Sequence, residues 1–290
     1  MKKDTAKTAE LELLFIMTLF GTIALVRRYI PLPSAVVADA RSFIGFAFLL
    51  VFTALRGIRL ELEAVKKNFI ILACSGVSLG INWVLLFEAY RYTSTAVAVL
   101  CNYVGPVFVI IGSVIFFGEK LSLRKFICVC MALGGVFLVS DVLQSGLPLG
   151  SNLLGIVCGL VSAVFYAVAV LFSKKLTSVG SYEKTIVQLG ASAFVILPYV
   201  LLTEKISAMQ FTPLSVALLV MLGVLHTGMA YAIYFHALNR VSLQTFSFFA
   251  YIEPVLTIIL SAAVLKEPLT LPEIFGACLI LGATLVSRNK

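Results

Sequence analysis

Glu253 is the residue of this sequence best placed to do chemistry in an apolar environment. It lies about ten residues into the apolar segment 243–265, and Pro254 follows it directly. An ionisable group at the centre of a bilayer costs at least about 2.5 kcal/mol, so Glu253 should face a cavity or a partner rather than lipid. Pro254 removes a backbone donor and breaks the helix locally, which exposes carbonyl groups. Two interpretations stay open: Glu253 couples protons or anchors a substrate, or it only satisfies the backbone groups that the proline frees.

A second proline, Pro106, stands 148 positions before Pro254, and Gly105 occupies the position equivalent to Glu253. The carboxylate is therefore present in only one of two similar segments, an asymmetry suited to binding a substrate or a proton. Helical spacing defines one face in each segment, and we expect both faces to line a central cavity. For the serines, close helix packing is the favoured interpretation. The faces consist of Thr95, Ala98, Asn102, Pro106 and Ser113, and of Phe246, Ala250, Glu253, Thr257 and Ser261.

Further polar and aromatic residues complete the candidate site. Trp83, the only tryptophan, lies beside Asn82 and could offer an aromatic surface to an apolar or cationic solute. His226 lies near the middle of its apolar segment and is either a gating residue or a buried, hydrogen-bonded histidine. The expected substrate-binding residues are Asn82, Trp83, Asn102, Tyr103, Phe246, Tyr251 and Glu253, and the expected coupling or gating residues are Glu253, Pro106, Pro254 and His226.

Other charged residues in apolar segments are interpreted as structural. Arg41 either holds an anionic group, or pairs with Asp39 or extends to the lipid headgroups, and we favour the second interpretation. Glu88 can form an ion pair with Arg91 one turn later. Glu267 follows the end of the apolar segment 243–265. Its negative charge is expected to interact favourably with the N-terminal dipole of the helix that comes next in the chain.

Composition sets the class of protein that must position these residues. Of 290 residues, 61% are hydrophobic and 12% charged, whereas a soluble domain has about a quarter charged residues. Ten spans of about 20 residues would use most of the chain and leave no room for a soluble domain. The ten predicted spans are 10–27, 34–55, 68–90, 94–117, 122–140, 150–173, 183–202, 213–239, 243–265 and 271–287.

The positive charges predict the orientation of these spans. If the N-terminus is cytoplasmic, 16 Lys and Arg residues fall on the cytoplasmic side and five on the outer side. This excess places both termini in the cytoplasm of a multi-pass protein of the inner or plasma membrane. The net charge of +8 then reflects topology and does not indicate binding to nucleic acid.

An internal repeat is the most informative pattern of the chain. Residues 86–139 align without a gap with residues 234–287, and 15 of the 54 positions are identical, where chance gives about 4 or 5. The repeat predicts two five-helix halves, 1–144 and 145–290. Because five is odd, the second half must enter the membrane from the opposite side, so the repeats are inverted. Inverted repeats are a common plan of secondary transporters, with the substrate site between the halves.

The repeated motifs resemble the EamA-type family of the drug/metabolite transporter superfamily. Gly105-Pro106, then Gly-Glu-Lys-Leu-Ser at 118–122, then Gly-Gly-Val at 134–136, recur as Glu253-Pro254, Lys-Glu-Pro-Leu-Thr at 266–270 and Gly-Ala-Thr at 282–284. The resemblance implies a ten-helix secondary carrier, often an exporter of amino acids or other small metabolites. Arg41 also stands where such proteins commonly carry an arginine.

The sequence thus predicts an all-α integral membrane protein that carries small organic solutes by alternating access, either proton-coupled or facilitative. No nucleotide-binding loop, zinc helix or nucleophile elbow is present, so we expect no enzymatic activity, cofactor or metal. The six cysteines lie in apolar runs and predict no disulfide. The expected partners are a small solute and the lipid bilayer, with the chain a monomer or a homodimer. The alternative is a membrane enzyme or scramblase that acts on a lipid or prenyl substrate.

Overall fold

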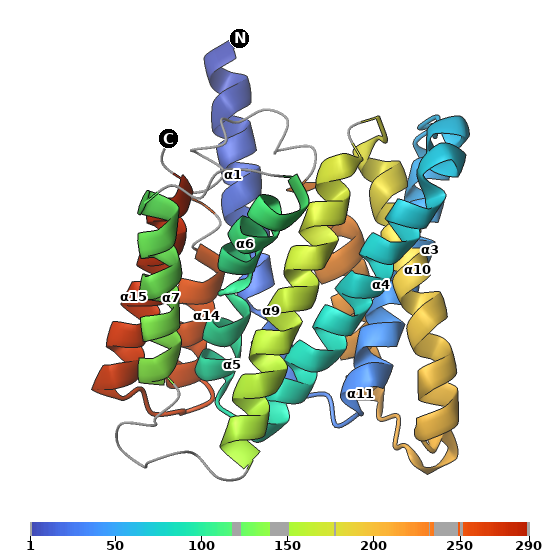
Figure 1. Ribbon diagram of the computed structural model, residues 1–290. Helices are drawn as coiled ribbons and strands as arrows, with labels where there is room; N and C mark the ends of the chain where they lie inside the picture. Colours follow the sequence, from blue (N-terminus) through green and yellow to red (C-terminus); the bar gives the residue numbers. More distant parts are fainter. Residues whose placement is uncertain are drawn as a thin grey trace.

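Helices running side by side between two ends of the molecule make up the fold (Figure 1). The computed structural model describes residues 2–117, 123–139, 151–176, 178–231, 233–234, 249 and 252–288, and this part of the chain contains no strand. Helix α1 begins and α15 ends at the same end, at the top of Figure 1. The α-helices are α1 (Lys2–Gly21), α2 (Ile23–Arg28), α3 (Ser34–Leu55), α4 (Leu62–Tyr92), α5 (Thr95–Asn102), α6 (Gly105–Phe117), α7 (Leu123–Val139), α9 (Ser151–Lys175), α10 (Ser181–Thr203), α11 (Pro213–Gly223), α14 (Ile252–Ala263) and α15 (Leu271–Arg288). A 3₁₀ turn, η1 (Ile206–Ala208), precedes α11, and a π-helix, η2 (Val224–Met229), follows it.

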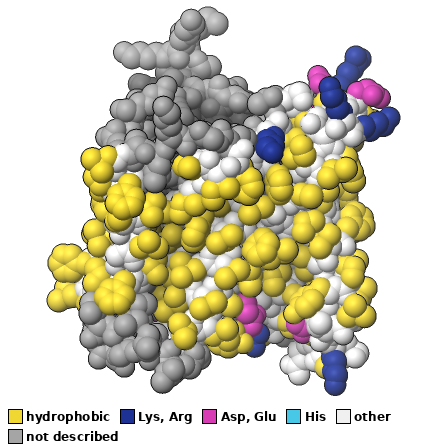
Figure 2. All heavy atoms as spheres, in the orientation of Figure 1, with side chains coloured by type: hydrophobic (Ala, Val, Ile, Leu, Met, Phe, Trp, Pro, Cys, Tyr) yellow, Lys and Arg dark blue, Asp and Glu magenta, His cyan; other side chains and the backbone are white. Residues whose placement is uncertain are grey.

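Six helical segments among the described residues are long and apolar enough to cross a bilayer. Four further apolar helices are shorter, so the ten-span topology stays a prediction. Figure 2 shows hydrophobic side chains across the middle of one face and charged side chains toward its two ends. Large apolar side chains such as Phe194 and Leu202 are exposed, at 63% and 86%. Apolar surface of this extent is stable in lipid rather than in water. The six segments are Thr8–Arg28, Ser34–Leu55, Leu62–Tyr92, Thr95–Phe116, Asn152–Ser173 and Ser181–Thr203.

Two segments predicted as single helices are each divided in two. The first predicted span breaks at Thr22 into α1 and α2, and the fourth breaks after Asn102 into α5 and α6. At the first break, the Thr22 hydroxyl donates to the Leu19 carbonyl at 2.7 Å, a bond that competes with regular helix geometry. At the second, Pro106 has no N–H to offer the Asn102 carbonyl. Irregular backbone at this depth is tolerated only where protein or a cavity surrounds it.

The α1–α2 break is packed tightly against α14. A Cβ atom at Gly21 would lie 3.0 Å from the Glu253 carbonyl oxygen, so a larger residue would require α14 to shift by a few tenths of an ångström. The Thr257 hydroxyl donates to the Gly21 carbonyl at 3.1 Å and to the Glu253 carbonyl at 2.9 Å. A helix of the second predicted half thus donates a hydrogen bond to a backbone carbonyl beside the break in the first predicted half.

Helices equivalent in the sequence repeat pack against each other. Adding 148 to the bounds of α7, 123 and 139, gives 271 and 287, and α15 spans 271–288. The same shift takes α3, 34–55, to 182–203, and α10 spans 181–203. The pairs α3 with α10 and α7 with α15 are both in contact, and α4 packs along α9 and α10. The two predicted halves are therefore in contact through several pairs of helices.

Close approach of α4 and α10 depends on Gly76, and this dependence can be tested. A Cβ atom at Gly76 would lie 2.4 Å from the Gln188 carbonyl oxygen. A Cβ atom at Gly134 in α7 would instead have no heavy atom of the described residues within 4 Å. We expect Gly76→Ala to lower the thermal unfolding midpoint in detergent, since overpacking costs about 1–3 kcal/mol. Gly134→Ala should be neutral or stabilising by up to about 1 kcal/mol. Equal midpoints for the two variants would contradict the described packing.

Candidate functional site

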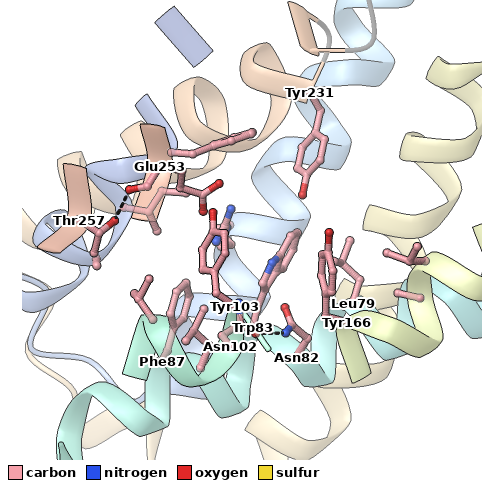
Figure 3. Close-up of a pocket in the computed structure, with 18 of the residues that line it drawn as sticks. Leu79, Asn82, Trp83, Phe87, Asn102, Tyr103, Tyr166, Tyr231, Glu253 and Thr257 are labelled. Atoms are coloured by element: carbon pink, nitrogen blue, oxygen red, sulfur yellow. Dashed lines mark hydrogen bonds between the residues drawn. The ribbon is translucent and has the colours of Figure 1, made fainter. Parts of the chain in front are cut away.

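A cavity of about 380 Å³ lies within the helix bundle, and Figure 3 shows the side chains around it. This volume is in the range of sites for small organic molecules. Its wall combines aromatic side chains with a few polar and charged groups contributed by both predicted halves. The lining residues include Arg41, Asn82, Trp83, Phe87, Tyr90, Asn102, Tyr103, Tyr166, Gln188, Tyr231, Glu253 and Thr257.

Arg41 supplies the positive charge of the cavity. It projects from α3, is 3% exposed, and its Nε donates to the Thr227 hydroxyl at 3.1 Å. The guanidinium carbon lies 4.1 Å from the centre of the Trp83 ring and 5.6 Å from that of Phe87. The favoured interpretation from the sequence, that Arg41 pairs with Asp39 or reaches the headgroups, is therefore wrong. A planar cation can stay in the apolar interior here because two aromatic faces and a hydroxyl replace its hydration.

Glu253 supplies the negative charge and lies opposite a tyrosine. It is the second residue of α14 and lines the cavity. The Tyr103 hydroxyl points toward its carboxylate (Figure 3). The hydroxyl groups of Tyr166 and Tyr231 point into the same space. The carboxylate can thus accept a hydrogen bond from the wall and still face a bound solute.

The two predicted asparagines form one hydrogen-bonded unit. The Asn82 amide donates to Asn102 Oδ1 at 3.0 Å and to the Ser162 carbonyl at 2.8 Å. The Ser162 hydroxyl also donates to Asn102 Oδ1, at 2.9 Å. These bonds join α4, α5 and α9 at the end of α5. Because the Asn102 oxygen already accepts two bonds, its NH₂ group is the part suited to bind a solute.

His226 lies behind the cavity wall and is not among the residues that line it. It is buried in the π-helix η2, with Nε2 3.0 Å from the Thr22 hydroxyl and Nδ1 3.3 Å from the Met221 carbonyl. The neighbouring Thr227 hydroxyl donates to the Leu222 carbonyl at 2.9 Å. His226 therefore connects η2 to the break between α1 and α2 and makes no direct contribution to the cavity.

The remaining predicted site residues divide into two groups. Pro106 is the second residue of α6, directly after the break, and Pro254 is buried in the first turn of α14. Phe246 and Tyr251 lie outside the described residues. The structure thus places Asn82, Trp83, Asn102, Tyr103 and Glu253 around one cavity.

Several lining residues carry little signal in the sequence. Phe87 belongs to the internal repeat, since Phe235 stands at the equivalent position, and Tyr90 lies one helical turn beyond it. Tyr166 and Tyr231 look like any tyrosine of an apolar helix. In the structure a side chain at Gly105 would lie 2.6 Å from the Tyr166 ring, so this tyrosine packs on the second helix break. Only the three-dimensional arrangement identifies it.

The prediction that Thr95 lines the cavity is wrong, whereas the favoured interpretation of Ser261 as a residue of helix packing agrees with its position. Thr95 and Ser261 do not line the cavity and instead bind the carboxylate of Glu267. The backbone N–H of Thr95 donates to Glu267 at 2.8 Å, so this acid caps α5 and not the helix that follows it in the chain. At the start of α15, Glu273 accepts the N–H of Thr270 instead, at 2.7 Å. Thr95 precedes the break and shares helix α5 with Asn102, but it lies about 10 Å farther along the helix axis, beyond the end of the cavity.

Comparison with known proteins gives one family and several relatives. The model of the EamA-like transporter family matches residues 8–141 and again residues 153–288. The uncharacterized transporter YxxF of Bacillus subtilis strain 168 is 26% identical over 97% of this chain and 91% of its own length. An uncharacterized transporter of Archaeoglobus fulgidus is 26% identical over 94% of this chain and 93% of its own length. The protein RarD of Salmonella typhi is 29% identical over 78% of this chain and 74% of its own.

A solved crystal structure of a protein matches with a TM-score of 0.68, at 20% identity and over 97% of both chains, which shows the same fold. The family model covers almost the whole chain in two matches, which confirms the resemblance seen in the repeated motifs. The chain belongs to the EamA-like transporter family and is a multi-pass helical membrane protein.

Proposed function

We propose that the chain carries small organic zwitterions, amino acids or related metabolites, across the cell membrane by alternating access. The observation behind this proposal is that two opposite charges, the Arg41 guanidinium and the Glu253 carboxylate, line the same cavity. A carboxylate group of the solute would bind Arg41, and its ammonium group would bind Glu253. Aromatic rings around both charges suit an apolar side chain.

Three observations support an arrangement of two inverted repeats, 1–144 and 145–290. The family model matches twice, helix bounds recur at an interval of 148, and α3 contacts α10 as α7 contacts α15. In inverted-repeat transporters the substrate site lies near the midplane, between the halves, on discontinuous helices. The breaks at Thr22 and after Asn102 border this cavity, as that plan requires.

The charge distribution supports cytoplasmic termini. Because α1 begins and α15 ends at one end of the molecule, a single orientation places both termini on the same side (Figure 1). The excess of Lys and Arg on that side favours the cytoplasm. With the cavity complete within one chain, a monomer suffices for binding, and the direction we propose is export.

Glu253 would couple transport to protons by competition. An ionised Glu253 holds the solute's ammonium group, and protonation of the same carboxylate removes that attraction. A proton entering from the acidic side therefore releases the solute there. Glu253 can exchange protons in this way because it faces the cavity and not lipid.

The alternative functions have less support. The names of the relatives indicate transporters and not enzymes. Among the described residues no group of three or more His, Cys, Asp or Glu could hold a metal ion.

Binding can be measured through Trp83, because it is the only tryptophan and lines the cavity. We expect some members of a set of amino acids to change its fluorescence saturably. The amide of the best ligand and its deaminated acid should each bind at least about tenfold more weakly, because each lacks one charged group. Arg41→Lys should weaken binding by about 1–2 kcal/mol, since a lysine loses the stacking on Trp83. Equal affinity for all three compounds would contradict a zwitterion site, and Trp83→Phe controls for signals from elsewhere.

Transport can be measured in sealed proteoliposomes with radiolabelled amino acids, with and without an imposed pH gradient. We expect saturable uptake that the gradient accelerates, and Glu253→Gln should remove the acceleration because an amide carries no proton. Glu88→Gln is a matched control, because it removes an acid that pairs with Arg91 at 2.8 Å outside the cavity. Full gradient-driven uptake by Glu253→Gln would disprove coupling through this residue, and absence of flux with folded protein would disprove the transporter.

A further inference from the structure

Glu267 joins three helices at one end of the molecule. Its carboxylate accepts hydrogen bonds from Arg28 of α2 at 2.6 Å, from the Thr95 backbone of α5 at 2.8 Å and from the Ser261 hydroxyl of α14. Arg28 Nε also donates to the Thr95 hydroxyl at 3.3 Å. Two of these helices belong to the first predicted half and one to the second. The ion pair therefore connects the halves.

The backbone turns Glu267 back over the end of α14. Lys266 has φ of 55°, which is uncommon for a residue with a side chain, and the Glu267 N–H donates to the Ser261 carbonyl at 3.2 Å. A residue in this conformation persists where surrounding contacts hold it. The bonds of Glu267 to Arg28 and Thr95 are such contacts.

The three joined helices also carry cavity residues. Thr95 is the first residue of α5 and Asn102 the last, and α14 carries both Ser261 and Glu253. On each helix about 10 to 12 Å separate the Glu267 contact from the cavity residue. The third helix, α2, lines the cavity through Ala24. A movement that separates these helix ends would therefore change the cavity wall.

A second hollow, of about 450 Å³, lies at the same end of the molecule. Arg27 and Arg91 line this hollow, whereas Phe87 and Tyr90 line the central cavity. The Arg27 guanidinium lies 5.8 Å from the centre of the Phe87 ring. One layer of side chains thus separates the two spaces, and Arg27 is the direct neighbour of Arg28.

From these contacts we propose that Arg28 and Glu267 form the gate that closes the cavity toward this end of the molecule. The pair is formed while the cavity is closed to this side and separates when α2, α5 and α14 move apart. Partial exposure suits such a cycle: the side chains of Arg28 and Glu267 are 35% and 16% exposed, so water can replace their bonds. A fully buried pair would cost far more to open. The gate rests on the proposed alternating access.

Labelling of a single cysteine tests the gate without any solute. Ala24→Cys, in a chain whose six native cysteines are replaced, places a thiol on the cavity wall. Sealed vesicles of known orientation are treated with a membrane-impermeant maleimide from one side or the other. We expect Glu267→Gln and Arg28→Gln each to raise the labelling rate from the gate side by about tenfold, because a charge-assisted hydrogen bond is lost. Labelling from the opposite side should fall.

Glu88→Gln is the matched control, because its pair with Arg91 also lies near this end but joins residues of one helix. Its labelling rate should stay within about twofold of the parent. Unchanged labelling in both gate variants, with monodisperse protein, would overturn the gate, and so would an equal rise from both sides. If the labelling rate rises from the gate side only, but the protein transports no solute in proteoliposomes, the result would contradict the proposed function and still support the gate.

Discussion

Placing charge inside an apolar helix bundle is the constraint on which the rest of this structure depends. An arginine and a carboxylate at membrane depth are stable only if the protein replaces the water they lose. Around Arg41 this replacement comes from the Trp83 ring and the Thr227 hydroxyl, and around Glu253 it comes from Tyr103. The aromatic wall is therefore part of the electrostatics of the cavity as well as its apolar lining.

The same constraint accounts for the positions of the helix breaks. Freed carbonyl groups need donors, and in the bundle these donors come from other helices, as Thr257 provides for Gly21. Irregular backbone and buried charge thus occur together, because both need a polar surrounding that lipid cannot supply. Glycine at position 21 lets α14 approach closely enough to supply it.

The sequence predicts the helical class well because composition and apolar length decide it. It also predicts Asn82, Trp83, Asn102, Tyr103 and Glu253 as site residues, since polar and aromatic groups in apolar helices need a cavity or a partner. The division of the halves and the roles of these residues remain proposals.

The failures of sequence-based prediction have a common physical cause. Sequence position predicts an interfacial Arg41, because a long side chain near a helix start usually reaches water. Its cation–π partner lies on another helix, and no spacing along one helix reveals it. Glu267 likewise caps a helix about 170 residues away in the chain, so local helix-dipole reasoning assigns it to the wrong helix. The positions of both side chains therefore depend on contacts between elements that are distant in the sequence.

The π-helix η2 links two otherwise separate parts of the site. His226 and Thr227 are adjacent, and both reach toward carbonyls five positions earlier: His226 Nδ1 lies 3.3 Å from the Met221 oxygen, and the Thr227 hydroxyl donates to the Leu222 oxygen. One of them holds the α1–α2 break through Thr22, and the other holds Arg41. A π turn contains more residues than an α turn, so deletion of one residue between 224 and 229 would rotate both side chains away from their partners together. Selection on this segment should therefore act on its length as strongly as on its residue types.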